Sequence, residues 1–477
     1  MRKIIYLTLI ASVWAGMVLA GCKETTQEDP EIPDGGGNDS TEVIVPEITD
    51  EMITDYFGET LEGSDSLFNG TLAIGTDAID ENRERIWNLW VQANNQYSED
   101  PLPAPDDLLN SHQASHWTLP QELEPNAIMP FYYGFKGSAP TEGYPLFVYL
   151  HGSGSKYAEW STGLALCQEF DDSPSLYFIP QIPNIGDYYR WWQKAKQFAW
   201  EKLLRLAFIS GDINPDRIYF FGISEGGYGS QRLASFYADY LAGAGPMAGG
   251  EPLRNAPPEN CANIAFSLRT GGEDTGFYRN TLSIAAKNYF NELEAAHPGY
   301  YVHNVEIIPG YGHSIDYYPT TPWLKEYERN PYPTYVAWEN FEMDGIYRDG
   351  FYNIAVIERS NDDYSTRTFY EMTIDGNDIT MNVNETTTTA TETDPLYGIE
   401  LEIEKSYTPS QKGRFLVYLC PELVNLDEEI SLTVNGTEVF RGIVEPDIRH
   451  LVNSCATFFD PQRLYPAAIE VDLGELE

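Results

Sequence analysis

Basic residues are scarce in this chain, and their scarcity excludes two classes of partner. The 477 residues include only 29 lysines and arginines against 73 aspartates and glutamates, which gives a formal net charge of −44. Nucleic acid and anionic membrane surfaces repel such a chain. We therefore expect no nucleic acid partner, and we interpret the acidity as a means of staying soluble in a crowded exterior.

Cysteine is rare as well. The five cysteines are Cys22, Cys167, Cys261, Cys420 and Cys455. They form no CxxC pair and no cysteine–histidine cluster at zinc spacing, so the sequence predicts no metal site. Two disulfides are left open by the sequence, Cys167–Cys261 and Cys420–Cys455.

Long apolar runs are lacking after the N-terminus. "MRKIIYLTLIASVWAGMVLAGC" begins with Arg2 and Lys3 and continues into a short apolar core, which is typical of a secretory signal. "LAGC" resembles the lipobox of bacterial lipoproteins, in which the peptide is cut before the cysteine and the cysteine is acylated. The resemblance implies that residues 1–21 are a signal peptide and that Cys22 carries a membrane-anchoring lipid.

Residues 22–45 are acidic, rich in glycine and proline, and poor in apolar side chains. This composition predicts a flexible tether. Acidic residues directly after the lipidated cysteine resemble the surface-export signal of Bacteroidetes lipoproteins. The resemblance implies an outer-membrane protein on the cell surface, and the periplasmic face stays open as an alternative.

Two further segments differ in pattern. Residues 46–127 carry helical periodicity, clearest in "DENRERIWNLWVQANNQ", and we expect a helical region that packs on a catalytic domain. In residues 128–330, near-continuous apolar strands alternate with helical segments. That pattern predicts an α/β domain whose mostly parallel sheet is covered by helices on both faces. The strand pattern occurs at 128–135, 144–152, 175–183, 217–224, 261–271 and 301–310.

The last segment, residues 331–477, has strand-like alternation throughout. The Asn-Gly pair in "VNGT" predicts a hairpin turn. We expect a β-rich, sandwich-like accessory domain here. The polar stretch "NETTTTATETD" at 384–394 is expected to be a loop.

"GISEG" at 222–226 matches the pattern G-x-S-x-G, between the apolar strand "RIYFF" and a helical segment. A serine at such a junction is held on a strained turn with its hydroxyl exposed, and the glycines leave room for that turn. Ser224 is therefore the candidate nucleophile. It needs a base, an orienting acid and donors for an oxyanion.

The candidate base is His313, which lies in the glycine-bearing loop of "IIPGYGHSIDYY" after a predicted strand. His297 and His303 are alternatives. His297 lies where a helix ends, and His303 lies within a strand, which would commit its side chain to the sheet.

The candidate acid is Asp274, in "SLRTGGEDTGFYRN", at the loop before the last helix of the domain. Its function would be to hold the imidazole tautomer and to stabilise the imidazolium. The neighbouring Glu273 could exchange roles with it. The order Ser224, Asp274, His313 is the order found in α/β-hydrolases.

The oxyanion donors are expected from two turns. "LFVYLHGSGS" is an apolar strand that ends in a tight turn, which could aim the N–H of Ser153 at the oxyanion. The second donor is the N–H of Glu225, directly after the nucleophile. His151 is interpreted as a structural residue of the first turn.

Together "YLHGSGS", "INPDRIYFFGISEGGYGS" and "GYGHSIDY" resemble α/β-hydrolase superfamily serine esterases over residues 128–325. They are similar to the branch of poly-hydroxybutyrate depolymerases, feruloyl esterases and predicted peptidases, where the segment before the elbow commonly reads like "DPDRIY". The resemblance implies a Ser-His-Asp triad that requires no metal or organic cofactor. That branch often carries more regular oxyanion and acid-loop sequences, so its substrate class transfers poorly to this chain.

Aromatic residues near the site suggest what it binds. The loop "IPNIGDYYRWWQ" should lie at the active-site edge of the sheet. The expected substrate-binding residues are Tyr188, Tyr189, Trp191, Trp192 and Tyr228. Trp191 and Trp192 could instead begin a helix and pack inward.

These features favour a secreted, lipid-anchored esterase that removes acetyl, feruloyl or longer acyl groups from polysaccharides. Its partner would be an ester-bearing small molecule or polysaccharide, and the sequence does not indicate an oligomeric state. Two alternatives stay open. One is a serine peptidase on the same fold, and the other is a non-catalytic surface protein that binds glycans.

Overall fold

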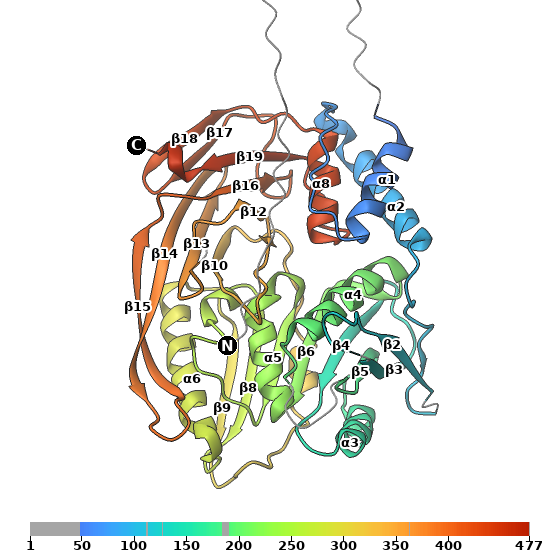
Figure 1. Ribbon diagram of the computed structural model, residues 1–477, viewed down its shortest axis with the longest axis vertical. Helices are drawn as coiled ribbons and strands as arrows, with labels where there is room; N and C mark the ends of the chain where they lie inside the picture. Colours follow the sequence, from blue (N-terminus) through green and yellow to red (C-terminus); the bar gives the residue numbers. More distant parts are fainter. Residues whose placement is uncertain (1–47, 111–112, 126, 184–189, 362, 477) are drawn as a thin grey trace, which may run out of the picture. The chain divides into compact units, whose positions relative to one another are not determined.

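The computed structural model of the protein describes residues 48–110, 113–125, 127–183, 190–361 and 363–476 (Figure 1). The predicted signal peptide, Cys22 and the tether lie outside the described residues, as do Tyr188 and Tyr189. None of the described helices is both long and apolar enough to cross a membrane.

A nine-stranded sheet organises the first half of the described chain. Its order is β1-β3-β5-β4-β6-β7-β8-β9, with β2 paired to β3. The run from β5 to β9 is parallel, whereas β3 is antiparallel to β5 and β2 is antiparallel to β3. The predicted mostly parallel sheet is therefore confirmed. The strands are β1 (Asp106–Asp107), β2 (Ala114–Thr118), β3 (Ile128–Lys136), β4 (Tyr144–Leu150), β5 (Ser175–Pro180), β6 (Ile213–Ile223), β7 (Gly243–Met247), β8 (Ala265–Gly271) and β9 (His303–Ile308).

Helices cover both faces of this sheet because its central strands are apolar on both sides. In β4, Leu146 and Val148 point into one core, whereas Phe147 and Tyr149 point into another. The first core holds α4 (Lys194–Ser210), α5 (Glu225–Phe236) and α6 (Arg279–Ala296), and the second holds α3 (Lys156–Glu169) and α7 (Thr320–Leu324). Burying a large apolar side chain fully in these cores contributes about 1.5–3 kcal/mol to the free energy of folding.

Three strands of the sheet were not anticipated. The sequence of β7 is GAGPM, which lacks the β-branched and aromatic residues that mark strands. Its glycines are needed for packing, since a Cβ at Gly243 would lie 2.7 Å from a carbonyl oxygen of β8, and one at Gly245 would lie 2.6 Å from the Thr320 side chain of α7. The other two are the short β1 and β2, so the sheet begins before residue 128.

The C-terminal region is β-rich, as predicted, and it consists of two sheets. The first has the order β10-β13-β14-β17-β18 with β15 paired to β14, and the second has the order β11-β12-β16-β19. Aromatic rings join the sheets, as where Trp338 of β10 stacks on Phe351 of β11 at 5.3 Å. Asn435 and Gly436 both have positive φ (50° and 83°), as the predicted Asn-Gly hairpin requires. The strands are β10 (Tyr335–Asn340), β11 (Gly350–Phe351), β12 (Ile354–Glu358), β13 (Thr366–Asp375), β14 (Asp378–Thr393), β15 (Glu400–Pro409), β16 (Arg414–Leu419), β17 (Ile430–Val434), β18 (Thr437–Gly442) and β19 (Ala467–Asp472).

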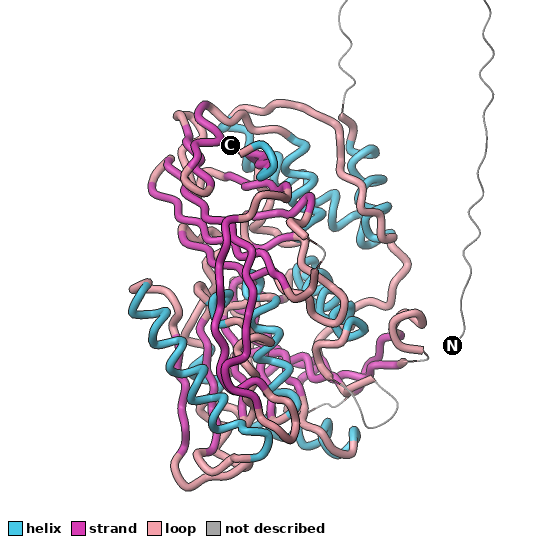
Figure 2. Tube along the Cα trace, turned by 60° about the vertical axis from the view of Figure 1, so that its left-hand side comes forward, coloured by secondary structure: helices cyan, strands magenta, loops and turns pink. Residues whose placement is uncertain are grey.

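The polar stretch 384–394 is not the expected loop, because β14 continues through it to Thr393. Threonine is β-branched and suits a strand, and the main chain of this part pairs with β15. The β14–β15 hairpin leaves the sheet and runs along α6, as Figures 1 and 2 show. Lys405 of this hairpin forms a buried ion pair with Glu259 at 2.6 Å, which fixes it to the α/β region.

The sequence analysis also missed a helix, α8 (Ile448–Phe458), in the C-terminal region. Asp447 caps it by accepting a hydrogen bond from the N–H of Arg449. The predicted N-terminal helical face is confirmed in α2 (Ile79–Gln96). However, α2 and α1 (Asp50–Leu61) share their apolar core with α8. Short 3₁₀ helices complete the described elements: η1 (Thr76–Ala78), η2 (Ala238–Tyr240), η3 (Pro258–Cys261), η4 (Gly276–Tyr278) and η5 (Leu473–Glu475).

A buried network of ion pairs joins the α/β region to the C-terminal region. Asp460 accepts from Arg329 at 2.5 Å and from Arg463 at 2.8 Å, and these three side chains are fully buried. Arg463 also pairs with Asp239 of η2 at 2.6 Å. Residues 48–477 consequently form one compact unit.

Neither disulfide that the sequence left open is formed. The thiols of Cys167, Cys261, Cys420 and Cys455 are all free and buried. Cys167 belongs to the core on one face of the large sheet and Cys261 to the core on the other. Cys420 and Cys455 are likewise in different apolar clusters.

Candidate active site

Ser224 lies at the turn between β6 and α5. Its φ and ψ are 57° and −111°, a conformation that a side-chain-bearing residue rarely adopts. The turn closes on its neighbours so tightly that a Cβ on Gly226 would lie 1.9 Å from the carbonyl oxygen of Leu150. A Cβ on Gly222 would lie 2.5 Å from the same oxygen. Glycine at both positions therefore allows the strained turn.

The structure brings Ser224, His313 and Asp274 into one hydrogen-bonded chain. The distance from His313 Nε2 to Ser224 Oγ is 3.0 Å, and that from His313 Nδ1 to Asp274 Oδ2 is 2.7 Å. Because an ionised carboxylate only accepts, Nδ1 must carry the proton, which leaves the lone pair of Nε2 facing the serine hydroxyl. The imidazole is half exposed, whereas the Asp274 side chain is only 3% exposed.

Asp274 is held from its other side too. Its Oδ1 accepts a hydrogen bond from Arg279 Nη1 at 3.0 Å. Each carboxylate oxygen thus has its own donor, which fixes the plane of the carboxylate and hence the imidazole ring.

The alternative candidates lie elsewhere. His297 stacks on Tyr335 and contacts its hydroxyl at 3.2 Å. His303 has both ring nitrogens engaged, with Tyr301 and with Asn291. Glu273 is exposed, and its N–H donates to the carbonyl of Tyr311. The ring nitrogens of His313 instead face Asp274 and Ser224.

Three observations decide the fold. The serine lies on a strand–turn–helix elbow, the sheet below it is mostly parallel, and the acid and the base lie on loops after later strands. This is the α/β-hydrolase fold. We found no family model and no curated protein that matches the chain.

Among solved structures, the chain is similar to a thermostable esterase, with 19% identity and a TM-score of 0.36 over 46% of this chain and 64% of the other. A ferulic acid esterase aligns at 14% identity and a TM-score of 0.34, over 45% of this chain and 98% of the other. The acetyl xylan esterase from Aspergillus awamori aligns at 11% identity and a TM-score of 0.31, over 43% of this chain and 94% of the other.

The residues predicted to supply the oxyanion donors, Ser153 and Glu225, both lie next to Ser224. Glu225 is the first residue of α5, so its N–H has no partner within the helix. The turn that carries Ser153 passes next to the elbow, since a Cβ on Gly152 would lie 3.5 Å from the Cβ of Ser224. Among the described residues, neither N–H has an acceptor. Both are available to a developing oxyanion.

His151 holds that turn in place. Its Nε2 accepts the N–H of Ile182 at 3.0 Å, so Nδ1 carries the proton and donates to the carbonyl of Gly152 at 2.7 Å. Burial lowers the pKa of His151 to about 4, which keeps the ring neutral. The structure places it as the structural turn residue that the sequence predicted.

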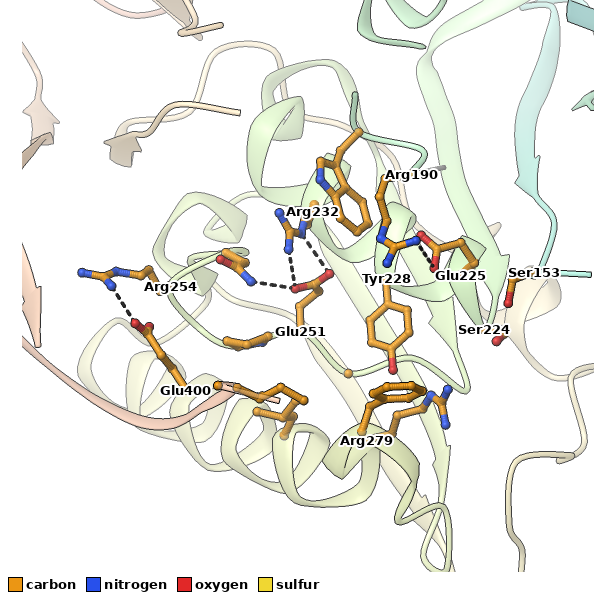
Figure 3. Close-up of a pocket in the computed structure, with 18 of the residues that line it drawn as sticks. Ser153, Arg190, Ser224, Glu225, Tyr228, Arg232, Glu251, Arg254, Arg279 and Glu400 are labelled. Carbon is orange, nitrogen blue, oxygen red and sulfur yellow. Dashed lines mark hydrogen bonds and ion pairs between the residues drawn. The ribbon is translucent and has the colours of Figure 1, made fainter. Parts of the chain in front are cut away.

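A cavity of about 950 Å³ extends from Ser224 (Figure 3). Ser153 and Ser224 lie at one end, and Arg254 with Glu400 lies at the other. Four arginines line it in a protein of net charge −44. These arginines are Arg190, Arg232, Arg254 and Arg279.

The predicted aromatic platform is only partly present. Trp191 is fully buried, and its indole N–H donates to the carbonyl of His151 at 2.9 Å, so its prediction as a substrate-binding residue is wrong. The fold uses this indole to brace the oxyanion turn. Trp192 and Tyr228 do line the cavity. The guanidinium of Arg232 stacks on Trp192, 3.8 Å from the ring centroid.

Sequence reasoning missed one wall of the cavity, which the C-terminal region supplies. Glu400, at the start of β15, forms an ion pair with Arg254 at 2.6 Å. Next to it, Phe277 of the acid loop packs against Tyr397 of the hairpin turn at 5.2 Å. Phe277 has a φ of 51° and Tyr278 one of 59°, so two bulky residues in a row hold strained backbone conformations beside Asp274. The sequence carries no signal for this wall, because its residues lie far apart in the chain and meet only after folding.

Burial affects the charge of one carboxyl group at the Ser224 end of the cavity, that of Glu225. The Glu225 side chain is 9% exposed and lies 3.6 Å from Arg190. Burial raises its pKa to about 7, against the opposing pull of Arg190. Within the described part of the chain, no three His, Cys, Asp or Glu side chains are placed to hold a metal ion.

Proposed function

We propose that this protein is a serine hydrolase of carboxylic esters. One observation carries the proposal, namely the hydrogen-bonded chain from Ser224 through His313 to Asp274. Ser224 Oγ attacks the ester carbonyl while His313 Nε2 takes its proton. The N–H groups of Ser153 and Glu225 stabilise the oxyanion, and electrostatic stabilisation of that kind is worth about 10²–10³ in rate per donor.

The second half of the reaction returns the enzyme to its starting state. His313 gives its proton to the departing alcohol, which leaves an acyl group on Ser224. Water, deprotonated by the same imidazole, then releases the carboxylic acid. Asp274 stays ionised and stabilises the imidazolium in both halves.

The proposed substrates are acyl esters of carbohydrates, of the acetyl or feruloyl type. A cavity of about 950 Å³ has room for a sugar ring with its acyl group. Its lining supports this class, because it combines the aromatic side chains of Trp192, Tyr228 and Phe277 with charged ones. The turn at 394–399 restricts the cavity on the side of the C-terminal region.

Labelling with a fluorophosphonate probe tests the nucleophile. The wild type should be labelled and Ser224→Ala should not. A panel of p-nitrophenyl esters set against aminoacyl nitroanilides then separates an esterase from a peptidase. Labelling that survives the substitution would refute the assignment of Ser224.

We also propose that Cys22 is acylated and anchors the enzyme to the outer membrane. The support is the sequence "LAGC", since this residue lies outside the described structure. Metabolic incorporation of an alkyne fatty acid should label the wild type and not Cys22→Ala. If both variants are labelled equally, lipid is attached elsewhere.

A further inference from the structure

The backbone of the acid loop is strained between two side chains that orient the triad. Phe277 has φ and ψ of 51° and 27°, and Tyr278 has 59° and 27°. Both values lie in the left-handed region, where the Cβ crowds the backbone and each residue costs free energy. Asp274 precedes this bend and Arg279 follows it, and Arg279 Nη1 donates back to Asp274 Oδ1 at 3.0 Å. The contact that fixes Asp274 therefore depends on a conformation that is unfavourable for the loop by itself.

The tip of the β14–β15 hairpin contacts both strained residues. The Tyr278 hydroxyl donates to Asp394 Oδ1 at 2.7 Å, although 116 positions separate the two residues. The ring of Phe277 packs against that of Tyr397, with 5.2 Å between the centroids. Asp394 is only 2% exposed, and its Oδ2 accepts from the N–H groups of Leu396 at 3.2 Å and Tyr397 at 2.5 Å. One buried carboxylate thus shapes the hairpin turn and links it to the acid loop.

The hairpin is anchored close to its tip. Arg254 pairs with Glu400 of β15 at 2.6 Å, and its Nη2 donates to the carbonyl of Thr388 of β14 at 2.7 Å. Further along, Lys405 forms its buried ion pair with Glu259. The hairpin also runs along α6, the helix that begins directly after the strained bend (Figure 1). These contacts make the hairpin a fixed support for the loop.

A shift of the bend would reach the reacting groups through a short series of contacts. Arg279 holds one oxygen of Asp274, and the other oxygen accepts from His313 Nδ1 at 2.7 Å. The opposite nitrogen of that imidazole lies 3.0 Å from Ser224 Oγ. Displacing a catalytic group by about 1 Å can lower the rate by about 100-fold. The support of the bend therefore bears on the chemical step.

We propose that Asp394 and Tyr397, at the tip of the hairpin, are positioning residues that hold the acid loop in its catalytic conformation. The proposal rests on the proposed function of the same site. Within the described structure neither side chain lines the cavity, so both act on Asp274 through Phe277 and Tyr278. Without these contacts the bend relaxes, and Asp274 no longer orients His313 in every molecule. The loss falls on kcat, because a small ester binds at the Ser224 end of the cavity.

Two substitutions test the two contacts. Tyr278→Phe removes only the hydroxyl that donates to Asp394, and Tyr397→Ala removes the ring beside Phe277. Each is assayed with p-nitrophenyl acetate, and kcat is expressed per active site titrated to completion with a fluorophosphonate, so that unfolded molecules do not count. We expect kcat to fall by about tenfold in Tyr278→Phe, the effect of one hydrogen bond to a charged group. In Tyr397→Ala, the loss of an aromatic contact should lower kcat by about threefold. KM for this ester should stay at the wild-type value in both.

Further variants separate positioning from general damage. Tyr397→Phe keeps the ring and should keep the wild-type kcat. In a Phe277→Gly background, Tyr397→Ala should cause no further loss, because the partner ring is gone and glycine adopts a φ of 51° without strain. Tyr364→Ala is the matched control, at an exposed tyrosine of the C-terminal region that does not line the cavity, and it should keep both kcat and KM.

The outcomes separate this proposal from the proposed function. An unchanged kcat in Tyr278→Phe and Tyr397→Ala, in a wild type that hydrolyses the ester, overturns the positioning role and leaves the esterase. The same holds if Tyr364→Ala reproduces the loss, or if Tyr397→Ala is equally harmful in the Phe277→Gly background. A rise in KM alone would show that the hairpin tip binds the substrate instead. Failure of the wild type to react with a fluorophosphonate or with any ester removes the proposed function itself.

Discussion

Replacing Asp274 by asparagine should keep the triad in place but give His313 its proton on the wrong nitrogen. In the wild type, Oδ1 accepts from Arg279 at 3.0 Å and Oδ2 accepts from His313 Nδ1 at 2.7 Å. Arginine only donates, so the new side chain must turn its carbonyl oxygen to Arg279 and its NH₂ group to the imidazole. Nδ1 then has to accept, which moves the ring proton to Nε2. That nitrogen faces Ser224 Oγ at 3.0 Å and can no longer take its proton.

The size of this effect follows from the role of the base. An imidazole in the wrong tautomer provides no general base, and the imidazolium also loses its carboxylate partner. The corresponding change in a serine protease lowers kcat by about 10⁴-fold. We expect a fall of the same order here, or about 5.5 kcal/mol in the barrier.

The structure also predicts how the loss can be partly reversed. In the double variant Asp274→Asn with Arg279→Met, the arginine no longer dictates the orientation of the amide, so its oxygen can turn to Nδ1. We expect kcat/KM for a p-nitrophenyl ester to rise about tenfold above that of Asp274→Asn alone.

Thermal unfolding of each variant checks that the fold is kept. If Asp274→Asn retains activity within about tenfold of the wild type, another group orients His313 and the assigned triad is wrong. A double variant no faster than the single one would show that Arg279 does not hold the amide.

Three further predictions concern the elbow, the cavity and the buried network. Gly226→Ala should abolish fluorophosphonate labelling, because its Cβ would lie 1.9 Å from a backbone oxygen of β4; retained labelling contradicts the tight turn. Since burial raises the pKa of Glu225 to about 7, its ionised form should repel an anionic substrate in the cavity that it lines, so the ratio of kcat/KM for mono-p-nitrophenyl glutarate over p-nitrophenyl pentanoate should fall as pH rises through about 7. Glu225→Gln should flatten that profile, and a profile unchanged by the substitution speaks against this origin. The charged groups facing this carboxyl are Arg190, Glu251, Arg232 and Arg279. Asp460→Asn should lower the free energy of unfolding in urea by about 3–5 kcal/mol, because two arginines would stay buried with a weaker partner; a loss under 1 kcal/mol would show that the network relaxes.

The strands that the sequence predicted are those whose own side chains specify them. In β4 and β6, aromatic and aliphatic residues fill both faces, so burial is written into the composition. In β7 the neighbouring strand and helix leave no room for a Cβ at Gly243 and Gly245. The short segment GAGPM therefore lacks the side chains by which a strand is recognised in a sequence. Helix α8 was within reach, since Ile448, Leu451, Val452 and Cys455 repeat at helical spacing.

For the site, the sequence was informative where chemistry follows a local pattern. The elbow glycines marked Ser224, and the loops after later strands marked Asp274 and His313. The cavity arginines had no such mark, since Arg190 and Arg279 are 89 positions apart and only the folded chain brings them to the same cavity. Trp191 was ambiguous because an indole suits both a ligand platform and a core, and only the position of His151 decides.

The β14–β15 hairpin makes the last third of the chain part of the catalytic cavity. Glu400 lines that cavity and Tyr397 packs on Phe277, although both stand more than a hundred positions beyond the acid loop. A chain shortened to the hydrolase half would thus have a cleft open on one flank, with Arg254 lacking its counter-ion. Replacing the C-terminal region by another domain would therefore change which substrates fit the cavity. Substitutions at the hairpin turn should change selectivity without altering Ser224, His313 or Asp274.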